Sequence, residues 1–337
     1  MKILSLFAGC GGLDLGLKDY GHELVWANDN DLNCTETYRN NIGDHILLED
    51  IYNLKLEEIP DGDVVVGGFP CQGFSIANPY RTEEDKRNLL FVPMAKILAE
   101  KKPKYFIGEN VQGLTNTGGY ETQEDRKNKT GRMFKLVLKE FNDAGYKIFW
   151  NIIDVSKLGI PQKRKRVIIF GVRNDLFEGK VPRFYYSDEE AQPKTVRDAI
   201  GDLPMDYSSD IPNHTGTKHK VKINGYIGNR ATKWDDASPT IVGRGGGTGG
   251  PVIIPHPNLH RRLSVRECAR IQTFPDNFVF LGSNSSQYRQ IGNAVPVKFG
   301  YYIGRFLSDY ANNTASGNLY LEFKEFLYEN PNITLFP

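Results

Sequence analysis

Cysteine is scarce in this chain and never occurs as a close pair. The 337 residues include four cysteines without a C-x-x-C motif and six histidines without a metal-ligand spacing. A disulfide framework and a metal site are therefore not expected, and the expected compartment is the reducing cytoplasm. The chain also lacks an apolar run long enough to span a bilayer, so no membrane association is expected.

Net charge is nearly absent as well. The 42 basic and 41 acidic residues leave a formal charge of +1, which excludes a strongly cationic protein that coats DNA. Glycine is the one residue in excess, with 34 of 337 residues, or about 10%, against a usual ~7%. Many backbone positions therefore need to be free of a Cβ atom.

Short apolar segments alternate with amphipathic segments over the first 175 residues. This alternation is typical of βαβ units, and it predicts an α/β fold with a doubly wound, mostly parallel sheet. The charged segment 121–130 is expected to be a mobile loop. Strands are expected at 2–7, 22–29, 61–70, 103–111, 147–155 and 166–172. A glycine-rich turn followed by a helix is expected within 8–21, and further helices at 32–40, 89–101 and 131–145.

The composition changes after about residue 175. Residues 176–260 are rich in Pro, Gly, Asn, Thr and Ser, which predicts a smaller, irregular domain or a large insertion. Helical patterns return at 264–274 and 295–310. We therefore expect three parts, at 1–175, 176–285 and 286–337, the last of which returns to the first.

A glycine-rich turn, FAGCGG, lies at 7–12 between the first expected strand and its helix. Such a turn lets a ligand approach the backbone near a helix N-terminus. Neither G-x-G-x-x-G in its usual register nor G-K-[ST] is present, so a phosphate-binding P-loop is disfavoured. Asp29 and Asp50 end the next extended segments, where carboxylates can bind ribose hydroxyls and an adenine amino group. The alternative is a plain turn with two solvated acids.

Three further features place reactive or charged groups at strand ends. Cys71 follows an expected strand in GGFPCQGFS, where it is either a nucleophile or a small buried apolar residue. Glu109 closes the strand KYFIGEN, and an acid among apolar residues needs a partner. Arg164 and Arg166 lie on one face of a strand, where they can hold a carboxylate, phosphate or planar base unless the strand is a solvated edge.

In this order, the motifs resemble those of the DNA cytosine-5 methyltransferases, and the resemblance covers nearly the whole chain. It implies a catalytic domain that binds S-adenosylmethionine and a target-recognition domain at 176–285. It also suggests the methylating half of a bacterial restriction-modification system. The motifs are FAGCGG (7–12), GGFPCQGFS (67–75), ENV (109–111), QKRKR (162–166), RECARIQTFPD (266–276) and QIGNAVP (290–296).

The resemblance also implies residue roles. Cys71 would attack C6 of a flipped-out cytosine, Glu109 would contact N3 and the amino group, and Arg164 and Arg166 would hold the base. The segment after Cys71 would close over the base as a lid. Cofactor-binding positions are Phe7, Gly9, Gly11, Gly12, Asp29, Asp50, Ile51, Asn293 and Val295, and candidates for DNA contact are Ser75, Arg81, Arg87, Arg230, Thr240 and Arg244.

Two positions depart from the family pattern. Asp29 replaces the more usual Glu, and Asn30 stands where an aromatic residue is common. The shorter Asp29 side chain predicts a weaker or water-bridged ribose contact. Residues Arg266, Glu267 and Arg270 resemble a scaffold that ties the small domain to the large one.

The expected partner is double-stranded DNA, bound by a monomer, with a cognate restriction endonuclease as a genetic rather than a physical partner. Basic residues concentrate at 81–87, 126–132, 163–166 and 218–233, so a nearly neutral protein can still bind phosphates in a salt-sensitive way. A tRNA methyltransferase of the same fold is disfavoured because no Cys-Phe-Thr signature is present. A DNA-binding regulator with a degenerate site is disfavoured by the intact Cys71, Glu109, Arg164 and Arg166. A nicotinamide dehydrogenase is least favoured, because the glycine register is wrong.

Overall fold

The computed structural model describes residues 1–70, 89–216, 232–243, 253–258 and 261–327. Within them, one large sheet has the strand order β10-β6-β7-β5-β4-β1-β2-β3. The strands from β3 to β5 are parallel, whereas β7, β6 and β10 continue the sheet in antiparallel pairs. The predicted α/β fold with a mostly parallel sheet is therefore confirmed.

Most expected elements appear within a few residues of their predicted bounds. The strands of the sheet are β1 (Lys2–Leu6), β2 (Glu23–Asp29), β3 (Ile46–Leu48), β4 (Val64–Gly67), β5 (Tyr105–Val111), β6 (Tyr146–Asp154), β7 (Lys165–Arg173) and β10 (Lys324–Glu325). The helices of the first part are α1 (Gly12–Tyr20), α2 (Leu32–Asn41), α3 (Phe91–Lys101), α4 (Gln123–Asn128) and α5 (Arg132–Asp143).

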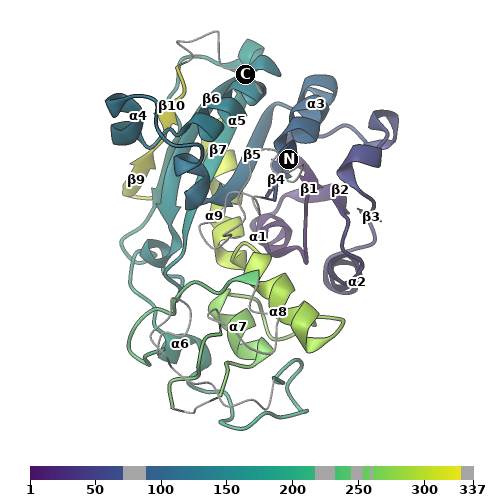
Figure 1. Cartoon of the computed structure of the whole chain (residues 1–337), viewed down its shortest axis with the longest axis vertical. Helices are drawn as coiled ribbons and strands as arrows, with labels where there is room; N and C mark the ends of the chain where they lie inside the picture. Colours follow the sequence, from purple (N-terminus) through teal and green to yellow (C-terminus); the bar gives the residue numbers. More distant parts are fainter. Residues whose placement is uncertain (71–88, 217–231, 244–252, 259–260, 328–337) are drawn as a thin grey trace.

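Helices cover both faces of the sheet (Figure 1). One apolar layer packs α3 and α5 against strand residues such as Leu4, Val65 and Phe106. The opposite layer packs α1 and α9 (Val297–Asn312) against the adjacent residues of the same strands, such as Ile3 and Ile107. Because successive side chains of a strand point to opposite faces, both faces of a central strand must be apolar, and these continuous apolar runs meet that need.

Helices α1 and α9 pack closely against each other, and this contact depends on glycine. A Cβ atom on Gly16 would lie 2.2 Å from the Val297 carbonyl oxygen, and one on Gly300 would lie 2.5 Å from that of Leu13. These approaches are too short for any side chain. Part of the glycine excess therefore serves to bring the C-terminal helix directly against the helix that follows the glycine-rich turn.

The expectation of a mobile loop at 121–130 is wrong. Residues 123–128 form α4, which begins with a capping box. The Thr122 hydroxyl accepts from the Asp125 N–H, and the Asp125 carboxylate accepts from the Thr122 N–H. Lys135 then contacts both Asp125 and Glu121. The T-x-x-D spacing at 122–125 was the overlooked helix signal.

The second half of the chain lies below the sheet in Figure 1, and its buried apolar residues form one cluster with residues of the first part such as Cys10, Ala27 and Tyr38. It contains α6 (Val196–Ile200), α7 (Val265–Ile271) and α8 (Asn284–Asn293). A two-stranded sheet, β8 (Arg183–Tyr186) with β9 (Leu319–Glu322), joins this half to the C-terminal segment. No helix in these described parts of the chain is long and apolar enough to cross a membrane.

The extended segment 279–281 joins the two halves through main-chain hydrogen bonds. On one side, the Asn41 side chain of α2 donates to the Val279 carbonyl (2.9 Å) and accepts from its N–H (2.8 Å). On the next residue, Asn213 makes the same pair of bonds with Phe280 (2.9 and 2.8 Å). The Leu281 N–H donates to the Thr37 hydroxyl. We refer to this arrangement as the asparagine brace.

Candidate active site

The carboxyl ends of β4 and β5 lie side by side, because Gly67 is paired with Gly108 in parallel register. Just beyond, a Cβ atom on Gly68 would lie 3.3 Å from Glu109 Oε2, so the main chain passes directly over that carboxylate. Asn110 donates to the Phe69 carbonyl at 2.9 Å, and the Phe69 ring is buried. The chain that leads to the Pro-Cys motif is thereby fixed beside Glu109.

Glu109 forms a buried ion pair with Arg166. Glu109 Oε1 and Arg166 Nε are 2.7 Å apart, and both side chains are about nine-tenths buried. In the antiparallel register, Arg166 is opposite Val111, which places its side chain diagonally across from Glu109 on the same face. Buried charges of this kind persist only when they are paired, so each side chain fixes the other.

Arg164 occupies a different environment. Its guanidinium is fully buried and donates to the carbonyls of Ile241 (2.8 Å), Ala294 (2.9 Å) and Gly292 (3.2 Å). Burial, together with the nearby Arg166, lowers its pKa. The two arginines thus have separate tasks: Arg166 pairs with the carboxylate, and Arg164 joins three distant segments of main chain.

The glycine-rich turn has a strained but well-supported backbone. Phe7 (φ 55°), Gly9 (φ 58°) and Gly11 (φ 89°) all adopt the left-handed region, which is costly for Phe7 and natural for glycine. A Cβ atom on Gly9 would contact nothing, so open space faces the turn there. On Gly12 it would lie 2.3 Å from the Val295 carbonyl oxygen, which places 294–296 against the turn.

Asp29 supports this turn from the end of β2. Its Oδ2 accepts from the Gly9 N–H at 2.8 Å, and its Oδ1 accepts from the Asp31 N–H at 2.9 Å. Burial raises the pKa of Asp29, although both N–H donors oppose that effect. Asp50 Oδ1 accepts from the Tyr52 N–H beside the buried Ile51, and Asn293 lies against Gly243.

A buried carboxylate beneath the turn was not expected from the sequence. Asp14 accepts hydrogen bonds from the hydroxyls of Ser5 (2.7 Å) and Tyr38 (2.9 Å), and the Tyr38 hydroxyl also contacts His45 Nε2 (3.0 Å). Asp14 is fully buried on α1 beside Leu13 and Leu17. An acid on the apolar face of an amphipathic helix was the available signal.

Asp14 predicts a specific pH dependence of stability. Burial raises its pKa from 3.8 to about 6, so the folded protein holds a proton over this interval that the unfolded chain releases. The free energy of unfolding therefore falls as the pH rises from about 4 to about 6, by up to roughly 3 kcal/mol from this group. We expect Asp14→Asn to lose that decline in urea titrations across pH 4–8. A decline equal to that of wild type would contradict this assignment.

The three described cysteines are unsuited to nucleophilic attack. Cys10, Cys34 and Cys268 are all buried, and burial raises the pKa of Cys10 and of Cys268 to about 12. The pKa of Cys34 is raised further for the same reason. Thiolates are the reactive form of cysteine, so these side chains are inert near neutral pH.

A cavity of about 310 Å³ adjoins Arg166. This volume lies at the lower end of the range of small-ligand sites. The cavity includes Thr240, one of the expected DNA contacts, although the Thr240 hydroxyl donates to the Lys163 carbonyl. Its lining residues are Gln112, Asp154, Lys163, Lys165, Arg166 and Thr240. Cys71, Ser75, Arg81, Arg87, Arg230 and Arg244 lie outside the described residues.

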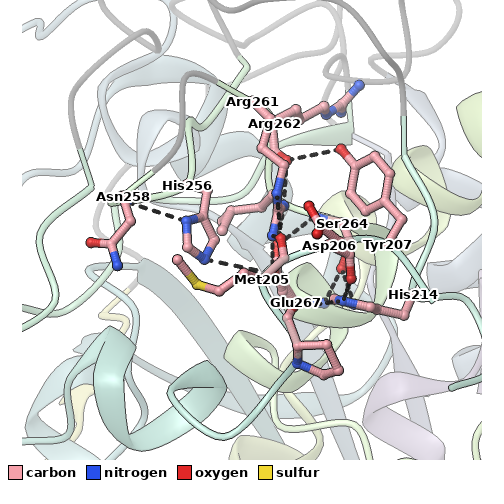
Figure 2. Close-up of polar contacts among 12 residues, drawn as sticks. Met205, Asp206, Tyr207, His214, His256, Asn258, Arg261, Arg262, Ser264 and Glu267 are labelled. Carbon is pink, nitrogen blue, oxygen red and sulfur yellow. Dashed lines mark hydrogen bonds and ion pairs between the residues drawn. The ribbon is translucent and has the colours of Figure 1, made fainter.

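A buried polar network organises the second half (Figure 2). Arg261 forms a double hydrogen bond with Glu267 (2.9 and 2.7 Å), and His214 contacts the Ser264 hydroxyl at 2.9 Å. Ser264 is fully buried and caps α7, which indicates a structural role rather than a nucleophilic one.

The expected scaffold residues belong to this half. Arg266 donates to the carbonyls of Pro212, Pro275 and Phe278, and Arg270 pairs with Asp202 and Asp276. Arg266, Glu267 and Arg270 were expected to tie the small domain to the large one. Their described side-chain partners instead lie within 199–278, so these three residues stabilise the second half internally.

A model of the C-5 cytosine-specific DNA methylase family matches residues 1–309. The chain belongs to this family of DNA methyltransferases. Among curated proteins it is similar to the type II methyltransferase M.MthTI of Methanothermobacter thermautotrophicus, with 36% identity over 88% of this chain and 94% of the relative. M.BspRI of Lysinibacillus sphaericus is 33% identical over 94% of this chain and 84% of the relative.

Solved structures agree with the fold of this DNA methyltransferase. A putative DNA modification methyltransferase encoded within an E. coli prophage superposes with a TM-score of 0.68 at 25% identity, over 93% of this chain and 99% of that one. The S. pombe Dnmt2 methyltransferase gives a TM-score of 0.63 at 22% identity, over 92% of this chain and 99% of that one, which supports the fold alone.

Proposed function

We propose that this enzyme transfers a methyl group from S-adenosylmethionine to C5 of a flipped-out cytosine in a specific double-stranded DNA sequence. The observation that carries the proposal is the buried Glu109–Arg166 pair at the end of β5, with Gly68 directly against it and Cys71 three residues further along the chain. This arrangement supports a site in which a thiol and a carboxylate act on the same base.

The chemistry accounts for these residue types. C5 of cytosine is a poor nucleophile until the Cys71 thiolate adds to C6 and N3 gains a proton, which turns C5 into an enamine carbon. Glu109 is the group that would hold the proton at N3, and Arg166 would keep the carboxylate in place. After the methyl transfer, a water molecule would take the C5 proton, the Cys71 sulfur would leave as a thiolate, and the N3 proton would return to Glu109, which releases 5-methylcytosine. Because C6 is inaccessible inside a duplex, the base must first be flipped out.

The residues of the glycine-rich turn fit an S-adenosylmethionine site. Open space lies before Gly9, and the carboxylate of Asp29 is already oriented by two N–H donors. We propose that Phe7, Gly9, Gly11 and Gly12 bind the amino-acid part and Asp29 the ribose. Asp50 and Ile51 would then bind the adenine, with Asn293 and Val295 beside them. When bound, the cofactor supplies an electrophilic methyl group.

The partners follow from the same proposal. We propose that Ser75, Arg81, Arg87, Arg230, Thr240 and Arg244 contact DNA, and that residues 176–285 read the target sequence. The relatives M.MthTI and M.BspRI are named type II methyltransferases, which supports a role in protecting DNA from a cognate restriction endonuclease. We propose that the enzyme acts as a monomer.

Bisulfite sequencing of a plasmid treated with the protein and S-adenosylmethionine tests this function. We expect methylation of one cytosine within a single recurring sequence, and no methylation without the cofactor. Unmodified cytosines throughout the plasmid would contradict the proposal. Methylation of tRNA in a parallel reaction, with DNA left unmodified, would favour the tRNA enzyme instead.

A further inference from the structure

The segment 236–241 of the second half is hydrogen-bonded in register to residues 161–163, directly before β7. Ser238 N–H donates to the Pro161 carbonyl (2.9 Å), and Lys163 N–H donates to the Ser238 carbonyl (2.8 Å), as in a short parallel bridge. Lys163 Nζ also pairs with Asp236 at 2.6 Å. The segment therefore has one fixed alignment with the strand that carries Arg166.

The buried Gln162 side chain stabilises this alignment. Its Oε1 accepts from the Ile241 N–H at 3.1 Å. Its Nε2 donates to Gln272 Oε1 at 2.9 Å. One amide group thus uses its acceptor for the docked segment and its donor for Gln272, the residue that follows α7. Neither an apolar side chain nor a carboxylate can provide both an acceptor and a donor here.

Gln272 extends the connection to the end of α8. It is fully buried, and its Nε2 donates to the carbonyls of Ile291 (2.7 Å) and Ala294 (3.3 Å). Its main-chain oxygen accepts from the Val297 N–H at 3.1 Å. The two glutamines, which we call the glutamine clasp, therefore link the docked segment, β7 and the residues packed against the glycine-rich turn.

Arg164 binds the same segments of main chain as the two glutamines. It precedes β7, two residues from Gln162 and two from Arg166, and it donates to the carbonyls of Ile241 and Ala294, which the two glutamines also hold in place. A shift of segment 236–241 along β7 would break bonds to both Gln162 and Arg164. Buried polar groups that lose their partners are costly, so the junction has a strong preference for a single register.

We propose that Gln162 and Gln272 are positioning residues for sequence specificity, which set the alignment of the target-reading half relative to the Glu109–Arg166 pair. The proposal rests on the proposed function, because it presumes methylation of a defined sequence. Neither glutamine touches the base. Both act through the docked segment, which continues from Gly243 toward Arg244, a proposed DNA contact.

The test compares Gln162→Met, Gln272→Met and the double variant. Bisulfite sequencing under single-turnover conditions gives the ratio of methylation at the target sequence to that at sequences differing by one base pair. We expect each single variant to lower this ratio about tenfold, because a less fixed segment discriminates less between bases. Either single substitution removes the hydrogen bond between Gln162 and Gln272. The discrimination ratio of the double variant should therefore be only slightly below that of the more affected single variant.

Further variants separate positioning from folding. Gln162→Glu keeps the acceptor for Ile241 but loses the donor to Gln272, so it tests the clasp even where a methionine variant fails to fold. Arg197→Gln is the matched control, because it removes an exposed ion pair to Asp235 within the same half. We expect its discrimination ratio to equal that of wild type.

Three negative results are distinguishable. Folded glutamine variants that keep the wild-type discrimination ratio, with only a lower overall rate or melting temperature, would overturn the positioning role. Additive losses in the double variant would overturn the clasp as a unit. Absence of methylation by the wild-type protein would instead contradict the proposed function itself.

Discussion

Cys71→Ser is expected to lower methyl transfer to duplex DNA by at least about 10³-fold, as removal of a covalent nucleophile does in other enzymes. A serine hydroxyl is far less acidic than a thiol, so almost none of it is ionised to attack C6. The measurement is incorporation of labelled methyl from S-adenosylmethionine, at saturating DNA and cofactor, so that weaker binding does not imitate slower chemistry.

Cys268→Ala is the matched control for this substitution. Cys268 is buried in α7, where burial raises its pKa to about 12, and its loss should leave the rate near that of wild type. A covalent adduct with 5-fluorocytosine DNA should form with wild type and with Cys268→Ala but not with Cys71→Ser. Substantial transfer by the Cys71 variant would exclude the covalent mechanism.

Glu109→Gln is expected to lower the single-turnover rate about 10²- to 10⁴-fold, the usual range for loss of a proton-transfer group. The amide has nearly the shape of the carboxylate, but it cannot hold the N3 proton, and it leaves the buried Arg166 without its 2.7 Å counter-charge. The measurement is a rapid-quench time course with pre-bound DNA.

Glu124→Gln, in the exposed helix α4, controls for the general effect of removing a carboxylate. DNA affinity in a filter-binding assay should stay close to wild type in both variants, which separates chemistry from binding. A Glu109 variant whose rate stays within threefold of wild type would remove Glu109 from the mechanism.

The framework of the site was predictable because its signals are local. The ends of β4 and β5 are marked by apolar runs that stop at Gly67 and at Glu109, and parallel pairing brings these ends together. The glycine-rich turn was likewise predictable, because Gly9 and Gly11 adopt left-handed φ angles that residues with a Cβ atom rarely adopt. Hydrophobic periodicity and backbone preference thus place Glu109 and the turn without knowledge of distant contacts.

The remaining contacts were not predictable because they join residues far apart in the chain. Gln162 meets Gln272 across 110 positions, and Arg164 reaches Ala294 across 130. No periodicity marks which buried amide will pair with which backbone carbonyl. Alternation on a strand placed Arg164 and Arg166 on one face, but their different partners depend on how the second half packs against the first.

The asparagine brace tolerates sequence change in the segment 279–281 that it holds. Asn41 and Asn213 contact this segment through the N–H and carbonyl groups of Val279 and Phe280, and every residue except proline provides both groups. The hydrogen bonds that join the halves therefore do not restrict the side chains of this segment, whereas packing does restrict the buried Phe280. Substitutions in this segment can thus accumulate while the hydrogen bonds that attach it to α2 are inherited unchanged.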